Sequence, residues 1–145
     1  MAYTTKYKPT NPKKYKGDAN NIICRSLWER KFAKYADLNE NVLEWASEEI
    51  PIKYFDPTSK KVRRYFPDFY IKYLDKDKKI RKALIEIKPF RETQEPIRKK
   101  GKSNKSMIYE TLTYVKNQAK WQAAREFCAD NLFEFKIMTE KELGI

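Results

Sequence analysis

Apolar residues recur along the chain at two spacings, one typical of helices and the other typical of strands. A helix is predicted over residues 22–38, because apolar side chains recur there every three or four positions, at Cys24, Trp28, Phe32 and Tyr35. A longer helix is predicted over residues 106–130 by a second stripe at helical spacing, formed by Ile108, Leu112, Val115, Ala119, Ala123 and Phe127.

Between these helices the pattern changes to short runs rich in aromatic and β-branched residues, which are typical of strands. Such runs occupy residues 49–55, which follow a shorter partly apolar stretch at residues 42–45, and residues 62–74 and 80–88. A final strand is predicted over residues 133–138, where apolar and polar residues alternate. The predicted order is helix, three strands, helix, strand, which indicates a mixed α/β (α+β) fold.

A short charged turn at residues 75–79 joins the second and third of these strands, and such a turn implies an antiparallel hairpin. Asp68 lies near the start of one arm of this hairpin, and Glu86 and Lys88 lie near the end of the other. The hairpin therefore brings these three side chains together. Glu86 and Lys88 share one face of their strand, because successive side chains alternate between faces.

Two carboxylates and a lysine in this arrangement suit phosphodiester chemistry. The carboxylates of Asp68 and Glu86 can hold a hard divalent cation such as Mg²⁺ through oxygen ligands. The Lys88 ammonium can orient a water molecule or neutralise charge that develops on a phosphate. A plainer interpretation stays open, in which Glu86 and Lys88 form a surface pair and Asp68 closes a turn after Pro67.

Composition narrows the class of partner. The chain has 145 residues, of which 41% are hydrophobic, and both values suit a single domain, residues 1–145, with one core. Its net charge of +12 indicates a polyanionic partner, most often nucleic acid, although basic ribosomal or capsid-lining proteins share this balance. No long apolar run or signal peptide is evident, so we expect neither export nor membrane insertion.

Histidine is absent from the sequence, which excludes every nuclease mechanism that needs an imidazole base or ligand. Zinc is disfavoured too, because Cys24 and Cys128 lie far apart and show no metal-ligand spacing. We interpret both cysteines as small core residues of a protein in a reducing cytoplasm. An enzyme built from this sequence would therefore rely on carboxylates, lysine and a bound metal.

Two lysine-rich segments stand out from the predicted core. Residues 1–21 mix lysines and tyrosines without a regular period, and we expect an extended basic arm that contacts nucleic acid or is simply solvated. Residues 89–106 have almost no apolar side chains, and we expect a basic loop that clamps phosphates or serves as a linker. The candidate nucleic-acid contacts lie in this loop and on the second helix: Lys99, Lys100, Lys102, Lys105, Lys116 and Lys120.

The acids and the lysine resemble the motif of the PD-(D/E)XK nucleases, formed here by Pro67, Asp68, Glu86 and Lys88. The predicted order of elements resembles the restriction-endonuclease-like αβββαβ core, a central mixed sheet flanked by helices. The chain is similar to the TnsA-like transposon-end nucleases in the segments 25–30 and 65–69. It is more similar still to the head completion nucleases of T4-like phages, through the segments 11–18, 25–31, 65–70, 85–89 and 120–128.

This resemblance implies a nuclease of double-stranded DNA that uses Mg²⁺, for which Mn²⁺ can substitute, and no nucleotide cofactor. It implies that Asp68 and Glu86 are metal ligands, with the backbone carbonyl of Ile87 as a third, and that Lys88 is catalytic. Glu29 falls where many of these enzymes carry a further acid on the first helix, so it is a candidate catalytic residue and ligand. An ordinary surface bridge between Glu29 and Arg25 is the alternative.

The implied role is to cut or trim packaged DNA during head completion, with head, portal or neck proteins as partners, in the host cytoplasm or in the virion head. The alternative is a DNA-binding structural protein of the head or neck that keeps a nuclease fold for its shape. Against it, placing Asp68 and Glu86 together without a cation is costly because like charges repel. An RNA target stays open, since phosphate contacts do not distinguish the sugars.

Overall fold

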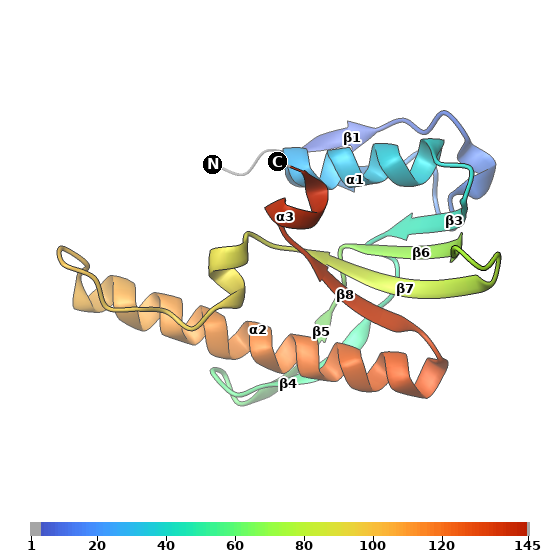
Figure 1. Ribbon diagram of the computed structural model, residues 1–145. Coiled ribbons are helices and arrows are strands. Elements are labelled where there is room, and N and C mark those ends of the chain that lie inside the picture. The colour runs from blue at the N-terminus through green and yellow to red at the C-terminus, as the bar shows by residue number, and fades with distance from the viewer. Residues whose placement is uncertain (1–3, 145) are drawn as a thin grey trace.

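The computed structural model describes residues 4–144, and a mixed sheet of four strands lies at its centre (Figure 1). The strands are β3 (Val42–Ser47), β6 (Phe69–Leu74), β7 (Ile80–Ile87) and β8 (Glu134–Met138), in the spatial order β3-β6-β7-β8. β3, β6 and β7 form an antiparallel meander, whereas β8 runs parallel to β7. A parallel pair needs a crossover connection, and the long helix between β7 and β8 provides it.

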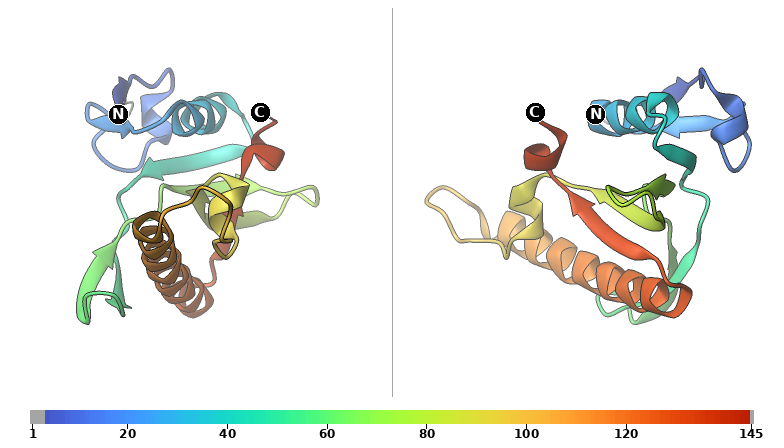
Figure 2. Two further views of the ribbon diagram at one scale, coloured as in Figure 1. Left: turned by 90° about the vertical axis from the view of Figure 1, so that its left-hand side faces the viewer. Right: turned by 45° about the vertical axis from the view of Figure 1, so that its right-hand side comes forward.

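Helices cover both sides of this sheet. α1 (Leu27–Leu38) lies on one side and α2 (Asn104–Asn131) on the other, as two views show (Figures 1 and 2). Each long helix starts at a serine cap, because the side chains of Ser26 and Ser103 accept a backbone N–H from the first turn. α3 (Glu140–Leu143) follows β8. The predicted architecture, a central mixed sheet flanked by helices, is confirmed.

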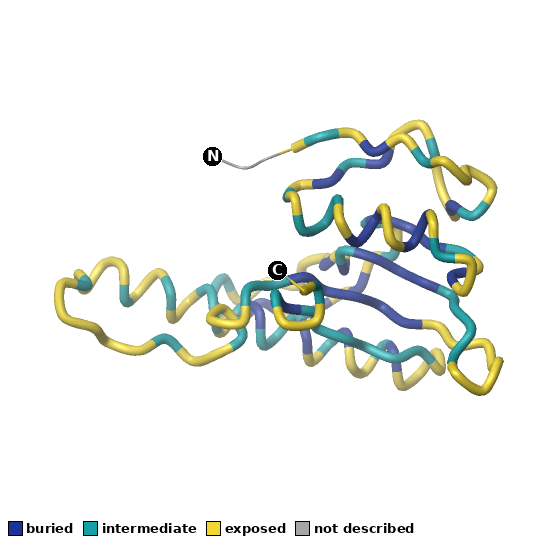
Figure 3. Tube along the Cα trace, turned by 45° about the horizontal axis from the view of Figure 1, so that its top comes forward, coloured by how far each residue is buried: buried dark blue, intermediate teal, exposed yellow. Residues whose placement is uncertain are grey.

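The core lies between the helices and the sheet, where the buried segments of β3, β6 and β7 meet (Figure 3). On the α1 side, the Phe69 ring lies 4.7 Å from that of Phe32 and 6.2 Å from that of Trp45. Trp121 of α2 is fully enclosed on the other side. β7 is central and buried on both faces, which explains why residues 83–87 are nearly all apolar. Glu86 is the exception in that run.

The N-terminal segment differs from its prediction. Residues 22–24 form a short strand, β2 (Ile22–Cys24), paired with β1 (Thr5–Tyr7), and the helix begins only at Leu27. Two β-branched residues followed by the Ser26 cap account for this boundary. The prediction of an arm apart from the core is therefore wrong for this segment, while residues 1–3 lie outside the described part of the chain.

Two tyrosines anchor that segment to the core. Tyr7 and Tyr15 are buried, with ring centroids 5.9 and 4.8 Å from that of Trp45, and Tyr15 follows a short 3-10 helix, η1 (Pro12–Lys14). The Tyr7 hydroxyl donates a 2.7 Å hydrogen bond to Asp37, a buried carboxylate on α1. Tyr7 and Tyr15, which lie in the segment expected to be an extended basic arm, are instead part of the core packing.

The segment before Asp68 also departs from expectation. β4 (Ile52–Asp56) and β5 (Lys61–Tyr65) pair only with each other, as a separate two-stranded hairpin, and the sheet strand is β3 instead of residues 49–55. The predicted strand over residues 62–74 is two strands, because Pro67 has no N–H to continue a ladder. This break leaves Asp68 between the hairpin and the sheet.

α2 is longer than its buried surface. Its core contacts come from the second half, through Asn117, Trp121, Ala124 and Cys128, whereas the first half extends past the sheet (Figure 1). The predicted apolar stripe is therefore wrong in its first half, where Ile108 is 61% exposed and Leu112 is 48% exposed. Cys24 and Cys128 are both buried free thiols, as predicted, although Cys24 lies in a strand.

The basic segment between β7 and α2 contains a short 3-10 helix, η2 (Phe90–Thr93), and then runs without helix or strand to residue 103. It returns beside the exposed half of α2 (Figure 1). Across residues 4–144, no helix combines the length and the apolar character that crossing a membrane requires.

Candidate active site

Asp68 and Glu86 come from neighbouring strands and lie opposite each other. In the register of β6 and β7, Phe69 pairs with Ile85, so the preceding residue Asp68 falls across from Glu86. The Asp68 carboxylate accepts a 2.8 Å hydrogen bond from the backbone N–H of Ile87. The backbone of Asp68 is held too, because its carbonyl accepts the N–H of Glu48 at 3.2 Å.

Glu86 and Lys88 occupy the same face at the end of β7. Glu86 is only 6% exposed, and its Oε1 accepts a 2.7 Å hydrogen bond from the hydroxyl of buried Tyr65. The backbone N–H of Lys88 donates to Met138 at the end of β8, which continues the parallel pairing past Ile87. Lys88 is half-buried, and its charge lies close enough to both acids to oppose the rise in their pKa values that burial causes.

The surroundings of Asp68 and Glu86 disfavour the charged form of both carboxyl groups. Loss of solvent around the carboxylate raises the pKa of Asp68 well above its usual value, and the charges of Glu86 and Glu29 raise it further. Burial likewise raises the pKa of Glu86, against the opposing effects of Tyr65, Lys88 and Lys120. Asp68 as a whole keeps some exposed surface, so this carboxylate pair is enclosed by protein yet reachable from one side.

Glu29 points toward the same acids. It lies in the first turn of α1, and burial together with the charges of Glu48 and Glu86 raises its pKa. Its Oε1 accepts the backbone N–H of Arg25 at 3.2 Å, while the Arg25 guanidinium pairs with Glu48 at 2.9 Å. The alternative of an exposed bridge between the side chains of Glu29 and Arg25 therefore does not describe this geometry.

Sequence reasoning missed the residues that support these acids. Tyr65 holds Glu86, and Arg25 sits among three acids, since Glu48, Glu29 and Asp68 all raise its pKa. Glu48 has a φ of 53°, a left-handed conformation that side chains rarely adopt and that clusters at functional sites. The contacts of Tyr65 with Glu86 and of Arg25 with Glu48 join residues more than 20 positions apart in sequence, so no local pattern could have revealed them.

The predicted nucleic-acid lysines fall into different environments. Lys120 is half-buried, with its ammonium 5.6 Å from the centroid of the Tyr65 ring. Burial lowers the pKa of this ammonium, and the charge of Glu86 opposes the shift. The Lys116 ammonium lies 3.7 Å from the buried carboxylate of Asp56. Lys102 donates to the carbonyl of Ile97 at 2.7 Å and pairs with Glu110.

Lys99, Lys100 and Lys105 are exposed. Lys99 and Lys100 lie in the loop beside the first half of α2, whereas Lys105 lies in the first turn of α2 itself, so the prediction of a loop as far as residue 106 is wrong at its end. The acids and Lys88 lie at the end of the sheet. The structure thus brings together Asp68, Glu86, Lys88, Glu29 and Lys120, and leaves the loop lysines outside this group.

The donor set fits a hard cation. Within the described range 4–144, no group of three or more His, Cys, Asp or Glu side chains is gathered closely enough to form a complete metal site. Asp68 and Glu86 nevertheless offer two carboxylates whose pKa values are raised, first by loss of solvent and, for Asp68, also by the charges of Glu86 and Glu29. Carboxylate and carbonyl oxygens with water in the remaining positions are the usual surroundings of Mg²⁺.

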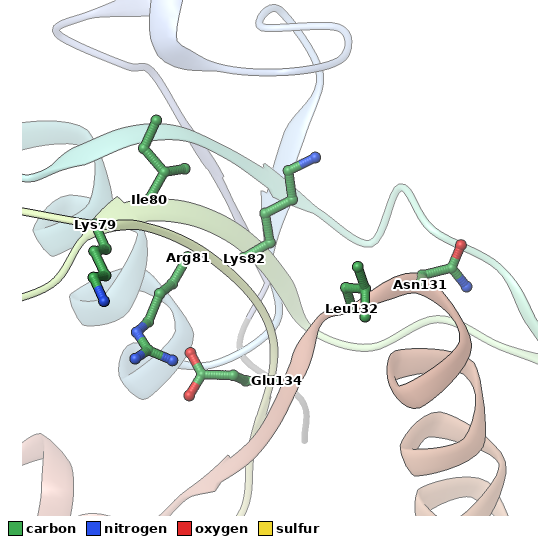
Figure 4. Close-up of a pocket in the computed structure, with 7 residues that line it drawn as sticks. All are labelled: Lys79, Ile80, Arg81, Lys82, Asn131, Leu132 and Glu134. Carbon is green, nitrogen blue, oxygen red and sulfur yellow. The ribbon is translucent and has the colours of Figure 1, made fainter.

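A separate hollow of about 440 Å³ lies at the other end of the sheet (Figure 4). It is lined by Lys79, Ile80, Arg81, Lys82, Asn131, Leu132 and Glu134. These residues are at the starts of β7 and β8, and six residues of a strand span about 20 Å. The hollow is therefore distinct from the acids at the end of β7.

Two comparisons with known proteins agree with this geometry. Residues 39–140 match the family described as TnsA-like endonuclease N terminal, a range that includes every strand of the central sheet. The chain is also 37% identical to the head completion nuclease of Enterobacteria phage T4 over 146 positions, which cover 99% of this chain and 95% of that relative. Glu29 lies outside the first match and within the second. The chain therefore belongs to the TnsA-like endonuclease family.

Proposed function

We propose that this chain is a metal-dependent nuclease that hydrolyses phosphodiester bonds of DNA, with its active site at Asp68, Glu86 and Lys88. The observation that carries the proposal is the pair of enclosed carboxylates beside a lysine. Burial raises both pKa values, the charges of Glu86 and Glu29 raise that of Asp68 further, and a bound divalent cation would relieve this.

Asp68, Glu86 and the carbonyl of Ile87 would hold Mg²⁺ or Mn²⁺. The cation, when bound, supplies Lewis-acid stabilisation of the scissile phosphate and makes water a stronger nucleophile. The Lys88 ammonium neutralises charge that grows on the phosphate and can hold the attacking water. Tyr65 fixes the orientation of Glu86 through its 2.7 Å hydrogen bond, and Glu29 adds a third negative group on the α1 side.

The biological setting follows from the relative. Because a protein named head completion nuclease shares 37% identity across almost the whole chain, we infer that this chain acts on packaged DNA during phage head completion. Its partners would be proteins of the head, portal or neck, and its place the host cytoplasm during assembly or the virion head. Residues 1–145 would then form a single nuclease domain.

Incubation of purified protein with circular and linear duplex DNA, in Mg²⁺, Mn²⁺ or chelator, tests this function. We expect nicked or shortened products with either metal and none with chelator. An RNA duplex of the same length, included as a parallel substrate, decides between the two nucleic acids. Tight binding of DNA that stays uncut under every metal condition would instead identify a DNA-binding structural protein.

A further inference from the structure

The β4–β5 hairpin presents one face to the protein and one to solvent. On the inner face, Asp56 and its neighbours pack toward α2, where Lys116 pairs with Asp56. On the outer face, Lys53 stands directly opposite Arg64, and Phe55 stands opposite Val62. All four outer residues are exposed, Phe55 by 57% and Val62 by 67% of their surface.

This outer face is poorly explained by folding alone. Like charges directly opposite on a strand pair destabilise it, and neither Lys53 nor Arg64 forms an ion pair with any residue from 4 to 144. The Arg64 guanidinium lies 5.6 Å from the ring centroid of half-exposed Phe66. A surface hollow is lined by Lys53, Val62, Arg63, Arg64 and Phe66, without any acid.

The hairpin is held firmly in place. Asp56 is fully buried and accepts hydrogen bonds from Thr58, Ser59 and Arg63, which fix the turn between the two strands. These bonds, first among them those from Thr58, lower the pKa of Asp56 far below its usual range. The Asp56 carboxylate therefore stays charged at physiological pH and keeps its hydrogen bonds to the turn of the hairpin.

The hairpin is also continuous with the candidate active site. β5 ends at Tyr65, whose hydroxyl holds Glu86, and Asp68 follows three residues later. Asp68 is four positions after Arg64, which limits the distance between their Cα atoms to about 14 Å even in an extended chain. That distance corresponds to about four base pairs of duplex rise.

We propose that the outer face of the β4–β5 hairpin binds duplex DNA beside the scissile phosphate. Lys53 and Arg64 contact backbone phosphates, which relieves their mutual repulsion, and Phe55, Val62 and Phe66 cover sugar and base edges. The surface has two unpaired cations and no acid, so a polyanion suits it better than a protein partner. This inference rests on the proposed function, and it gives the nuclease a contact surface outside the loop lysines.

The test is the salt dependence of duplex binding, measured by fluorescence anisotropy in chelator, for the double variant Lys53→Gln/Arg64→Gln. The matched control is Lys76→Gln/Lys79→Gln, which removes the same charge from exposed positions of the β6–β7 turn, at the other end of the molecule (Figure 2). Two phosphates that are no longer neutralised lower the slope of log K against log salt by about 1.8. At 0.15 M salt this corresponds to about 30-fold weaker binding.

We expect this change in the hairpin variant and less than half of it in the control. The melting temperature of the hairpin variant should be equal to that of the wild type or higher, because a like-charge pair has been removed. Should the double variant not fold, the single change Lys53→Gln serves, with an expected decrease in slope of about 0.9.

Equal slopes and affinities in the hairpin variant and its control would overturn the proposal. So would a change in self-association, seen by size-exclusion chromatography, without a change in DNA affinity. These outcomes are distinct from failure of the proposed nuclease function, which would appear as wild-type protein that binds DNA and does not cleave it in Mg²⁺.

Discussion

At the scale of single residues, the candidate site weakens the fold that carries it. The pKa of Asp68 is raised by loss of solvent, by Glu86 and by Glu29. A carboxyl group whose pKa is higher in the folded than in the unfolded state binds more protons when folded. Stability therefore falls as the pH rises from the unfolded pKa, about 3.9, through the folded one, and the loss is complete above it.

Asp68→Asn should accordingly raise the melting temperature of the metal-free protein near pH 7.5. The amide oxygen can still accept the N–H of Ile87, while the charge is gone. A gain of about 1 kcal/mol would raise Tm by about 2–4 °C in a chain of this size. Calorimetry in chelator at pH 7.5 and pH 4 measures it, and the gain should shrink at pH 4. A lower Tm than the wild type at both values would contradict the raised pKa.

Lys88→Ala should abolish cleavage without disturbing the fold or DNA affinity. Its ammonium faces both acids, and removing one group that stabilises charge in the transition state reduces kcat by about 10²–10³-fold. Single-turnover cleavage at saturating DNA separates this from binding, which anisotropy measures in parallel. A variant that cleaves at the wild-type rate would remove Lys88 from the mechanism.

Glu29→Gln tests the third acid. The amide oxygen can keep the hydrogen bond from the N–H of Arg25, and a carboxylate with a raised pKa is lost, so the melting temperature near pH 7.5 should equal that of the wild type or lie slightly above it. If Glu29 belongs to the reacting group, cleavage falls by more than about tenfold. Glu40→Gln, an exposed change just past the end of α1, is the control. Equal cleavage rates in the two variants would show that Glu29 has no part in the reaction and only lies in the first turn of α1.

At the scale of elements, the β6–β7 hairpin could be predicted from its short charged turn between two strand patterns, and the helix of the crossover from its apolar spacing, although only the second half of that helix is buried. The separation of β4 and β5 from the sheet could not, since a strand pattern does not say which strand it pairs with. The packing of Tyr7 and Tyr15 on Trp45 was hidden for a similar reason. Lysines around a tyrosine resemble a solvated arm until the tertiary contact is known.

The basic loop and the first half of α2, which lie side by side outside the core, carry three exposed lysines. Changing Lys99, Lys100 and Lys105 to glutamine should weaken duplex binding and lower the salt slope by about 0.9 for each phosphate that is no longer neutralised. The rate at saturating DNA should stay the same, because lysines that bind flanking phosphates stabilise ground and transition states alike. Lys102→Gln is a useful contrast, since this lysine holds Ile97 and Glu110. An unaltered slope in the triple variant would make the loop a solvated linker.

At the scale of the whole molecule, a basic chain carries an acidic site. The net charge is +12, and in the sequence the exposed cations of the hairpin and of the loop flank the segment 68–88, which carries Asp68, Glu86 and Lys88. Those three residues could be predicted from a short motif and the direction of two strands. Tyr65, Glu48 and Arg25 could not, because each joins the site through a contact that only the folded chain creates.

The measurement that tests the central claim most directly compares Glu86→Gln with Glu134→Gln in single-turnover cleavage of supercoiled plasmid with Mg²⁺. Each glutamate accepts a tyrosine hydroxyl, at 2.7 Å for Glu86 and 2.6 Å for Glu134, but Glu134 is at the start of β8, opposite Ala83 and three positions away from Glu86 along the sheet. Loss of about 3 kcal/mol of charge stabilisation predicts at least about a 100-fold slower rate for Glu86→Gln. We expect Glu134→Gln to cleave as the wild type does. Equal rates in all three proteins, or wild-type cleavage that persists in chelator, would contradict a metal-dependent site at Glu86.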